Sequence, residues 1–233
     1  MATVVDINAE RLETTSAVGP QLFRLLRDRI VRCELEPGVR LSEVDVAQFY
    51  GTSRQPVREA FIKLAEASLI EVRPQRGSYV RRIDIGAVMA ARFVREAVEA
   101  DIVRVVAERA TPADLSELDT ILARQSEAIE TDDPRPFMKL DETFHRRLAE
   151  IAGQGAGWDF LQPLKTQMDR VRHLSTRQFP RRVLVQQHMA IVDAIRARDA
   201  DAAVGHMRHH LRRILEDMPL VAAAMPAYFE KEP

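Results

Sequence analysis

The chain has 233 residues, of which 46% are hydrophobic, 30% are charged and 6% are aromatic. This length predicts one large domain or two small ones, and the apolar fraction excludes a disordered chain. No apolar run approaches the roughly 18 residues of a membrane span, the N-terminus lacks a signal-peptide pattern, and the single Cys33 excludes a disulfide scaffold or a cysteine-based zinc finger. We therefore expect a cytoplasmic protein with no membrane partner.

The formal net charge of -1 is unevenly distributed along the chain. Residues 15–82 contain 12 Lys and Arg against 8 Asp and Glu, whereas residues 83–233 contain 21 against 24, so the net charges are +4 and -3. A basic N-terminal part and an acidic remainder predict two domains with different partners. We place these domains at 16–82 and 83–219, between an N-terminal arm and a C-terminal tail formed by residues 1–15 and 220–233.

The N-terminal domain has the pattern of three short helices followed by a β-hairpin. Ser42 and Ser53 are suited to cap the second and third helices, and Gly77 suits the turn between the strands. This order is typical of a winged helix-turn-helix. The predicted elements are helices over 20–33, 43–50 and from 54 onward, and strands over 69–73 and 78–82.

In a helix-turn-helix, the first residues of the second helix of the motif contact base edges in the major groove of DNA. Arginine forms bidentate contacts with guanine, and a serine at a helix start can hold a phosphate. The hairpin turn is placed to reach a minor groove or the backbone. The candidate DNA-binding residues are therefore Ser53, Arg54, Gln55, Arg58, Arg76 and Gly77. Solvated surface arginines are the alternative interpretation.

After residue 84 the pattern changes to long amphipathic helices with no further strand signal. The fold class is thus mainly α, with a winged helix-turn-helix followed by an all-α bundle. Breaks at proline, glycine and aspartate predict six helices, near 86–110, 112–130, 134–152, 157–177, 181–198 and 200–218.

Four metal-ligand residue types share the apolar faces of three of these helices. Asp141 and His145 lie four residues apart, and His188 and His210 follow on later helices. An unpaired buried carboxylate is unfavourable, and a divalent cation would neutralise it and accept the imidazole nitrogens. The alternatives are core histidines bonded to backbone carbonyls, or a metal-free ion pair of Asp141 with a histidine. Helical phase assigns no role to the other histidines, His173, His206 and His209.

Residues 22–80 resemble the DNA-binding domain of the GntR family of bacterial transcription regulators. The run Ser53-Arg54-Gln55-Pro56-Val57-Arg58-Glu59-Ala60 carries most of the resemblance. The sequence departs from the usual pattern at Cys33-Glu34, where a glycine often sits, and at Ser68, where glycine commonly precedes the first strand of the wing. The resemblance implies a homodimeric repressor that binds a palindromic operator in double-stranded DNA.

Residues 86–218 resemble the all-α FCD ligand-binding domain, named for FadR and its relatives. Metal-binding members hold a divalent ion, most often zinc, with one aspartate and three histidines, and a small organic acid commonly completes the coordination. The resemblance therefore implies zinc, with nickel, manganese or iron as alternatives. The matching elements are Arg95-x-x-Val98-Glu99, Asp141-x-x-Phe144-His145, His188-x-x-Ile191 and Met207-x-x-His210-Leu211.

A carboxylate effector also needs a cationic partner. Arg95 occupies the family position that faces the cavity, and its guanidinium suits a carboxylate. An i,i+4 pair of Arg95 with Glu99 is the alternative. Trp158 is a second candidate for the effector pocket, or else a core residue.

Two other functions are alternatives to an acid-responsive regulator. A metal with bound water would suit a hydrolase or oxygenase, but the sequence offers no further general base in the same phase and carries a DNA-binding module. A repressor that senses the metal ion itself is the other alternative. We therefore expect a regulator and not an enzyme.

Overall fold

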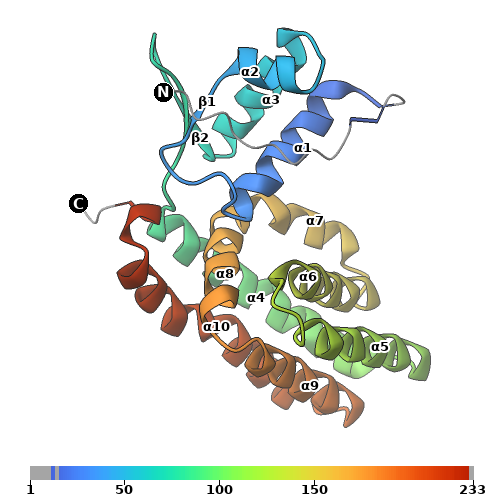
Figure 1. Cartoon of the computed structure of the whole chain (residues 1–233). Helices are drawn as coiled ribbons and strands as arrows, with labels where there is room; N and C mark the ends of the chain where they lie inside the picture. Colours follow the sequence, from blue (N-terminus) through green and yellow to red (C-terminus); the bar gives the residue numbers. More distant parts are fainter. Residues whose placement is uncertain (1–11, 14–15, 231–233) are drawn as a thin grey trace. The chain divides into compact units, whose positions relative to one another are not determined.

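The computed structural model describes residues 12, 13 and 16–230, so most of the expected arm 1–15 lies outside the described residues. The chain divides into two compact units, Met1–Ile85 with Met225–Pro233 and Gly86–Ala224 (Figure 1). Each unit has a hydrophobic core of its own. Every helix in the described part of the chain is too short or too polar to cross a lipid bilayer.

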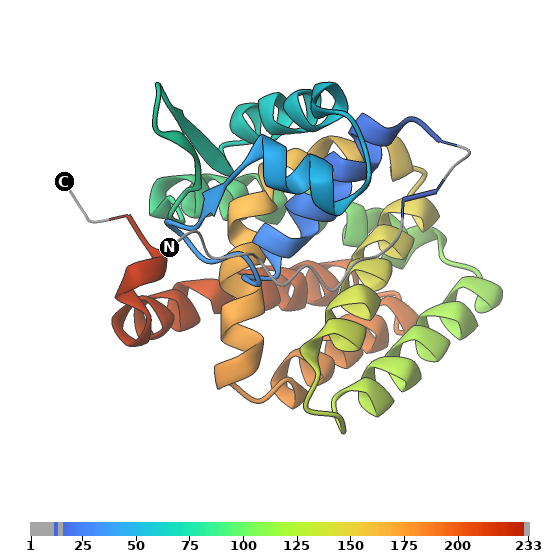
Figure 2. The ribbon, with the colours of Figure 1, turned by 45° about the horizontal axis from the view of Figure 1, so that its top comes forward.

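The N-terminal unit is a winged helix-turn-helix, as the sequence predicts. Three helices pack around a core that includes Leu22, Leu26, Val57 and Leu64, and a three-stranded antiparallel sheet lies beside them (Figure 2). Ser42 caps the second helix, since its side chain accepts a hydrogen bond from the Asp45 backbone. The elements are α1 (Val18–Val31), β1 (Arg40–Leu41), α2 (Glu43–Phe49), α3 (Arg54–Glu66), β2 (Ile70–Arg73) and β3 (Gly77–Val80).

The sheet has one strand more than the sequence analysis predicted. The strand order is β1-β3-β2, with Arg40 of the missed strand β1 paired to Tyr79. Two residues after Pro37-Gly38 are too short a run to show strand periodicity. At the start of β3, Gly77 has a φ of 103°, and a Cβ there would lie 2.9 Å from Arg40 Nε. The backbone therefore requires glycine at this point.

Both places where the sequence departs from the expected glycine pattern have left-handed backbone. Cys33, which follows α1, has a φ of 57°, and Ser68, which precedes β2, has a φ of 55°. Left-handed geometry costs an L-residue roughly 1–2 kcal/mol. At both turns the chain therefore adopts the left-handed backbone conformation that glycine favours, although a side chain makes this conformation less stable.

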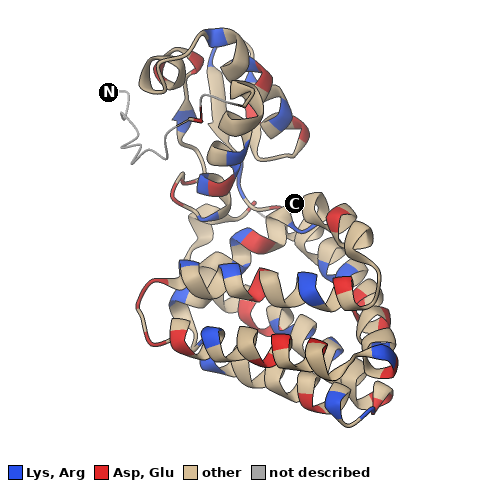
Figure 3. Cartoon of the chain, turned by 90° about the vertical axis from the view of Figure 1, so that its right-hand side faces the viewer, with Lys and Arg blue, Asp and Glu red and all other residues tan. Residues whose placement is uncertain are grey.

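The C-terminal unit is an all-α bundle, again as expected. Thr111 and Asp114 form a capping box at the start of the second helix of the bundle, and Asp133 caps the third, in each case with a proline at the first turn. Basic and acidic residues are interspersed along the helices of the bundle (Figure 3). Its helices are α4 (Ile85–Arg109), α5 (Pro112–Ala128), α6 (Pro134–Ile151), α7 (Gly155–Leu164), α8 (Thr166–Gln178), α9 (Arg182–Arg196) and α10 (Ala200–Ala224).

Two prolines behave differently from the sequence prediction. The single helix expected over 157–177 is two helices, α7 and α8, because Pro163 removes a backbone donor near their junction. The break expected at Pro219 does not end the last helix, which continues to Ala224. Met218 and Val221 on either side of that proline are buried, and this packing holds the final turns in place.

The structure also differs from the expected tail over 220–233. Residues 220–224 complete α10, and a 3-10 turn, η1 (Pro226–Tyr228), follows. Phe229 is buried and forms a parallel bridge with Ile83, where the Ile83 N–H donates to the Tyr228 carbonyl at 2.7 Å. The described end of the chain is therefore packed against the N-terminal unit to which it belongs.

Candidate functional site

The start of α3 presents its polar side chains to solvent. Ser53, Arg54, Gln55 and Arg58 are all exposed, while Val57 between them is fully buried. The Ser53 side chain makes no capping hydrogen bond. Arg54 Nη2 lies 3.2 Å from Glu43 Oε2 of α2, a solvent-accessible ion pair between the two helices of the motif. This surface has the donors that a phosphate or a base edge requires.

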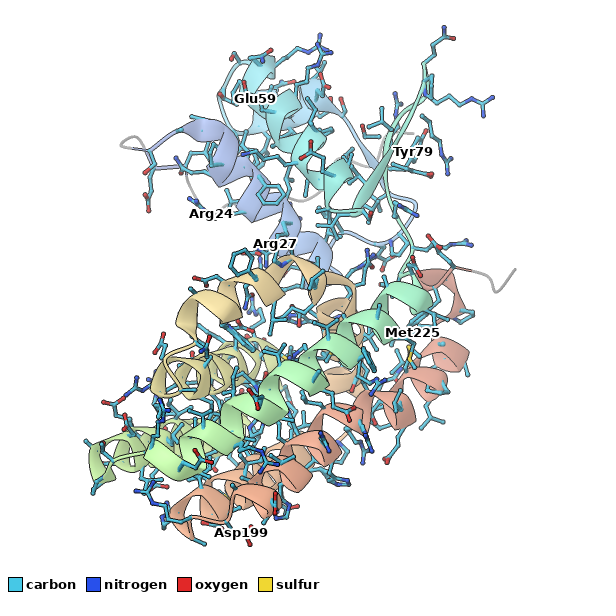
Figure 4. All side chains as sticks on the ribbon, turned by 180° about the vertical axis from the view of Figure 1, so that it is seen from behind. Arg24, Arg27, Glu59, Tyr79, Asp199 and Met225 are labelled. Atoms are coloured by element: carbon cyan, nitrogen blue, oxygen red, sulfur yellow. The ribbon has the colours of Figure 1, made fainter. Side chains whose placement is uncertain are left out.

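The β2–β3 hairpin extends beyond the helices of its unit (Figure 4, in which Tyr79 marks the hairpin). Arg76 at its turn is exposed, and its carbonyl accepts a hydrogen bond from the Tyr79 hydroxyl at 3.0 Å. Arg73 lies 4.6 Å from the centre of the Tyr79 ring. Contacts with Tyr79 therefore stabilise a turn that carries basic side chains.

In the bundle, the structure brings Asp141, His145, His188 and His210 together in the buried core. One ligand atom from each lies within 4.8 Å of the others. His210 Nε2 is 3.3 Å from both His188 Nε2 and His145 Nε2. In a tetrahedral zinc site with Zn–N bonds of about 2.0–2.1 Å, ligand atoms lie about 3.3–3.4 Å apart. The spacing of the nitrogens therefore fits a metal of this class.

The other nitrogen of each imidazole faces an oxygen. His145 Nδ1 lies 2.5 Å from Glu99 Oε2, His188 Nδ1 lies 2.8 Å from Gln125 Oε1, and His210 Nδ1 lies 3.0 Å from Gln187 Oε1. These acceptors favour a proton on each Nδ1 and leave three Nε2 lone pairs directed at one another. Such an arrangement is repulsive unless a cation lies between the nitrogens.

The amide of Gln125 is oriented by a second contact. Its nitrogen donates to the Leu140 carbonyl at 3.2 Å, so its oxygen must face His188. Gln125 is fully buried between the two groups. The tautomer of His188 therefore follows from the backbone of α6 and not from an arbitrary choice of amide orientation.

The carboxylate of Asp141 is buried and incompletely satisfied. Its Oδ1 has no hydrogen-bond partner among the described residues and lies 3.7 Å from His188 Nε2. Its Oδ2 accepts from Arg172. Burial alone would raise the pKa of Asp141, but Arg172 beside it holds that pKa well below its usual range. The carboxylate is therefore an anion with one oxygen open to a further partner.

Burial also affects the histidines. It lowers the pKa of His188 to about 3 and the pKa of His210 well below the usual range. Both rings are therefore neutral near pH 7, which is the form that binds a metal. The donor set, the orphaned oxygen and the neutral rings all fit a divalent ion.

Glu99 joins the cluster to Arg95. Its Oε1 accepts from Arg95 Nε at 2.6 Å, while its Oε2 faces His145. Burial raises the pKa of Glu99, yet Arg95 and His145 together lower it to about 2. The pair of Arg95 with Glu99, one of the two interpretations left open by the sequence, is thus present, but it does not use the whole guanidinium. Arg95 Nη2 is buried and has no hydrogen-bond partner among the described residues.

A cavity of about 30 Å³, partly open to solvent, lies beside the cluster. Arg95, Arg172 and His210 line it, so an anion inside would meet two guanidinium groups and one of the four clustered residues. Trp158 is not among the lining residues of this pocket. It is fully buried, its Nε1 donates to Glu142 Oε1 at 3.0 Å, and its ring stacks parallel to His145 at 6.0 Å between centres. Trp158 therefore supports the cluster from the core.

Sequence reasoning missed several residues that the structure brings to the site. Arg172 carried no signal because the break between α7 and α8 changes the helical phase. Gln125 and Gln187 had none either, since glutamines at these spacings are ordinary in helices. Of the unassigned histidines, His173 is buried, and the other two, His206 and His209, are exposed.

Two protein families match this chain. Residues 20–80 match the family described as bacterial regulatory proteins, gntR family, and residues 91–213 match the FCD domain. The two matches correspond to the winged helix-turn-helix and to the helical bundle.

Individual proteins are similar over almost the whole length. The HTH-type transcriptional repressor RspR of Escherichia coli (strain K12) is 40% identical over 95% of this chain and 98% of its own. Among solved structures, McbR/YncC of E. coli has a TM-score of 0.73 at 19% identity and covers 90% of this chain and 99% of its own, which shows the shared fold. A GntR transcriptional regulator from Rhodococcus sp. RHA1 has a TM-score of 0.70 at 26% identity, covering 89% and 99%.

Proposed function

Because this chain belongs to the GntR family of bacterial transcription regulators and carries an FCD domain, we propose that it is a cytoplasmic repressor controlled by a small organic acid. A homodimer would bind a palindromic operator with the exposed start of α3 in the major groove. Family membership makes the protein a regulator and not an enzyme. The name of RspR, a transcriptional repressor, supports the direction of control.

One observation carries the proposal for the sensing half. Three imidazole Nε2 atoms and an orphaned carboxylate oxygen converge beside a pocket lined by the buried Arg95 and the half-buried Arg172. Asp141, His145, His188 and His210 would hold the metal, and zinc is the first candidate for nitrogen and oxygen ligands at this spacing. When bound, the metal would supply a cationic partner for a carboxylate. Arg95 would supply the second, through its unpaired Nη2.

Regulation requires that the effector bind two arrangements of the protein with different affinity. The pocket residues lie on α4, α8, α9 and α10, so a ligand there contacts four helices at once. A carboxylate that pairs with Arg95 or Arg172 would change how these helices pack. This gives the effector a means to alter the bundle and, through it, operator affinity.

Direct metal sensing is the second candidate, because Arg172 donates to Asp141 in this structure. A cation at the open Oδ1 would share the Asp141 carboxylate with Arg172, so loading alone would weaken the hold of Asp141 on a pocket residue. Titration of zinc and of candidate acids against operator affinity separates the two functions. An ion sensor responds to zinc alone, whereas the favoured function requires the acid.

Two experiments test the proposal directly. A DNA sequence enriched from a random library by the wild-type protein is assayed by gel shift with the double variant Arg54→Ala, Arg58→Ala. Specific binding that survives both changes would refute the DNA-binding assignment. Metal content is then measured for His188→Ala, His210→Ala, with the exposed pair His206→Ala, His209→Ala as the matched control. Full metal content in the first variant would refute the metal assignment.

A further inference from the structure

An exposed apolar side chain lies beside the candidate DNA-binding residues. Val44 is in the first turn of α2 and is 50% exposed, whereas Val46 and Ala47 of the same helix are buried in the core of the N-terminal unit. The helix therefore makes its core contacts without Val44. Contact of this side chain with an apolar group of a partner would be favourable, because it would remove apolar surface from water.

The ion pair between α2 and α3 shows where Val44 lies. Its chain neighbour Glu43 pairs with Arg54, the first residue of α3, and 3.2 Å separates Glu43 Oε2 from Arg54 Nη2. The first turn of α2 is therefore next to the first turn of α3, which presents the polar residues assigned to DNA. Val44 is thus an apolar side chain at the edge of a polar, base-contacting surface.

The other large apolar residues exposed on this unit lie elsewhere. Phe49 is at the C-terminal end of α2, about 7.5 Å further along the helix axis than Val44. Ile62 follows Arg54 by eight residues of α3, or about 12 Å. Val72 is on strand β2 of the wing. Among the described residues of the unit, Val44 is therefore the exposed large apolar side chain that adjoins the start of α3.

The major groove offers an apolar group to such a side chain. Thymine presents its C5 methyl group there, and apolar side chains contact it, whereas the other three bases present only hydrogen-bonding groups. The side chains of Glu43 and Val44 have no donor for a phosphate oxygen. A thymine methyl is therefore the group on DNA that complements Val44.

We propose that Val44 contacts a thymine methyl group in each half-site of the operator and so determines a preference for thymine at that position. The inference rests on the proposed function, because it assumes that the start of α3 lies in the major groove. It adds a residue that determines specificity through an apolar contact to the polar residues already assigned to DNA.

The test removes one methyl group at a time from the DNA. An operator enriched from a random library by the wild-type protein is synthesised again with deoxyuridine in place of each thymine in turn. Uracil retains the pairing with adenine and lacks only the C5 methyl. Fluorescence anisotropy with the full-length protein measures each dissociation constant. Burial of one methyl group corresponds to about a fourfold change in affinity, so we expect one thymine in each half-site whose replacement weakens binding about fourfold.

Variants at Val44 assign this sensitivity to one side chain. Val44→Ala should reduce the difference between thymine and uracil to less than about twofold, because most of the apolar contact is lost. Val44→Ile retains the contact and should retain the difference. Ile62→Ala is the matched control, since Ile62 is 51% exposed in the same motif but lies about two turns beyond the start of α3. It should leave the difference unchanged, and melting temperatures establish that all three variants fold.

The outcomes separate the role of Val44 from the proposed function. Half-sites without a thymine that is sensitive to uracil, or the same difference in wild type and Val44→Ala, would overturn the role of Val44 alone. An equal loss of affinity of Val44→Ala for both DNAs would also overturn it, because it would indicate a structural role. If no sequence is enriched, or if Arg54→Ala, Arg58→Ala retains specific binding, the proposed function itself fails.

Discussion

Replacing Glu99 by glutamine perturbs the contact that joins Arg95 of the pocket to His145 of the histidine cluster. In the native protein one oxygen of Glu99 serves Arg95 and the other faces His145. Glutamine has one oxygen and one amide nitrogen, so it can accept from only one of these two donors. Its nitrogen would then face the other donor. The His145 ring is expected to lose the partner that orients its Nε2.

The magnitude follows from these contacts. A hydrogen bond to a charged group contributes about 1.5–3 kcal/mol, and loss of a partner behind a metal-binding histidine commonly weakens metal affinity about tenfold to a hundredfold. We therefore expect zinc affinity of Glu99→Gln to fall by about 1.4–2.7 kcal/mol. Competition with a chromophoric chelator measures this change, after circular dichroism has shown that the variant is folded.

Glu96→Gln is the matched control for this experiment. Glu96 lies one turn earlier on α4 and is also buried, but it pairs with Arg92 and Arg212 instead of the cluster. Its removal takes the same charge from the same helix and should leave zinc affinity unchanged. Equal zinc affinity in Glu99→Gln and wild type would refute the reasoning.

Three further predictions concern DNA binding, pH and the backbone. Arg58→Ala should weaken operator binding by about 1–3 kcal/mol and relax base preference, whereas Arg76→Ala should mainly lower the salt dependence of binding. A gel shift at several salt concentrations measures both effects, and Arg124→Ala, at an exposed position of α5, is the control. Equal losses of affinity in all three variants would contradict the assignment. Because burial lowers the pKa of His188 to about 3, the unfolded metal-free chain binds more protons than the folded one below about pH 6.5, so the free energy of unfolding should fall as pH falls toward 3. Urea denaturation measures this slope, and His188→Gln, which cannot titrate, should make it smaller; an unchanged slope would count against the burial argument. Ser68→Gly should raise the free energy of unfolding by roughly 1 kcal/mol, since it relieves the left-handed φ of 55°, while Gly51→Ala, at a φ of 61°, should lower it; thermal melting distinguishes these signs.

The fold was largely predictable because its signals are local. The N-cap residues Ser42, Thr111 and Asp133 each directly precede the helix that they cap. The spacing of apolar residues along each segment indicates which face of a helix is buried. The failures occurred where tertiary packing decides. A two-residue strand exists only because β3 lies beside it, and Pro219 is accepted inside α10 because the residues around it are buried.

The candidate site was predictable in its ligand types and not in its surroundings. Asp141 and the three histidines share apolar faces, which is visible in the sequence. Which oxygen faces each Nδ1 depends on how helices meet, so Gln125 could be found only in three dimensions. Arg172 was invisible for the same reason, since its partner Asp141 lies on another helix, 31 residues away in the chain.

The return of the C-terminal segment to Ile83 has a mechanical consequence. The polypeptide passes between the two units twice, once after Ile85 and once after Ala224. Two connections between two bodies restrict their relative motion more than a single connection does. The second linker is the direct continuation of α10, which carries His210. The bridge of Phe229 with Ile83 therefore joins the segment that immediately follows the wing to the part of the chain that continues from this helix.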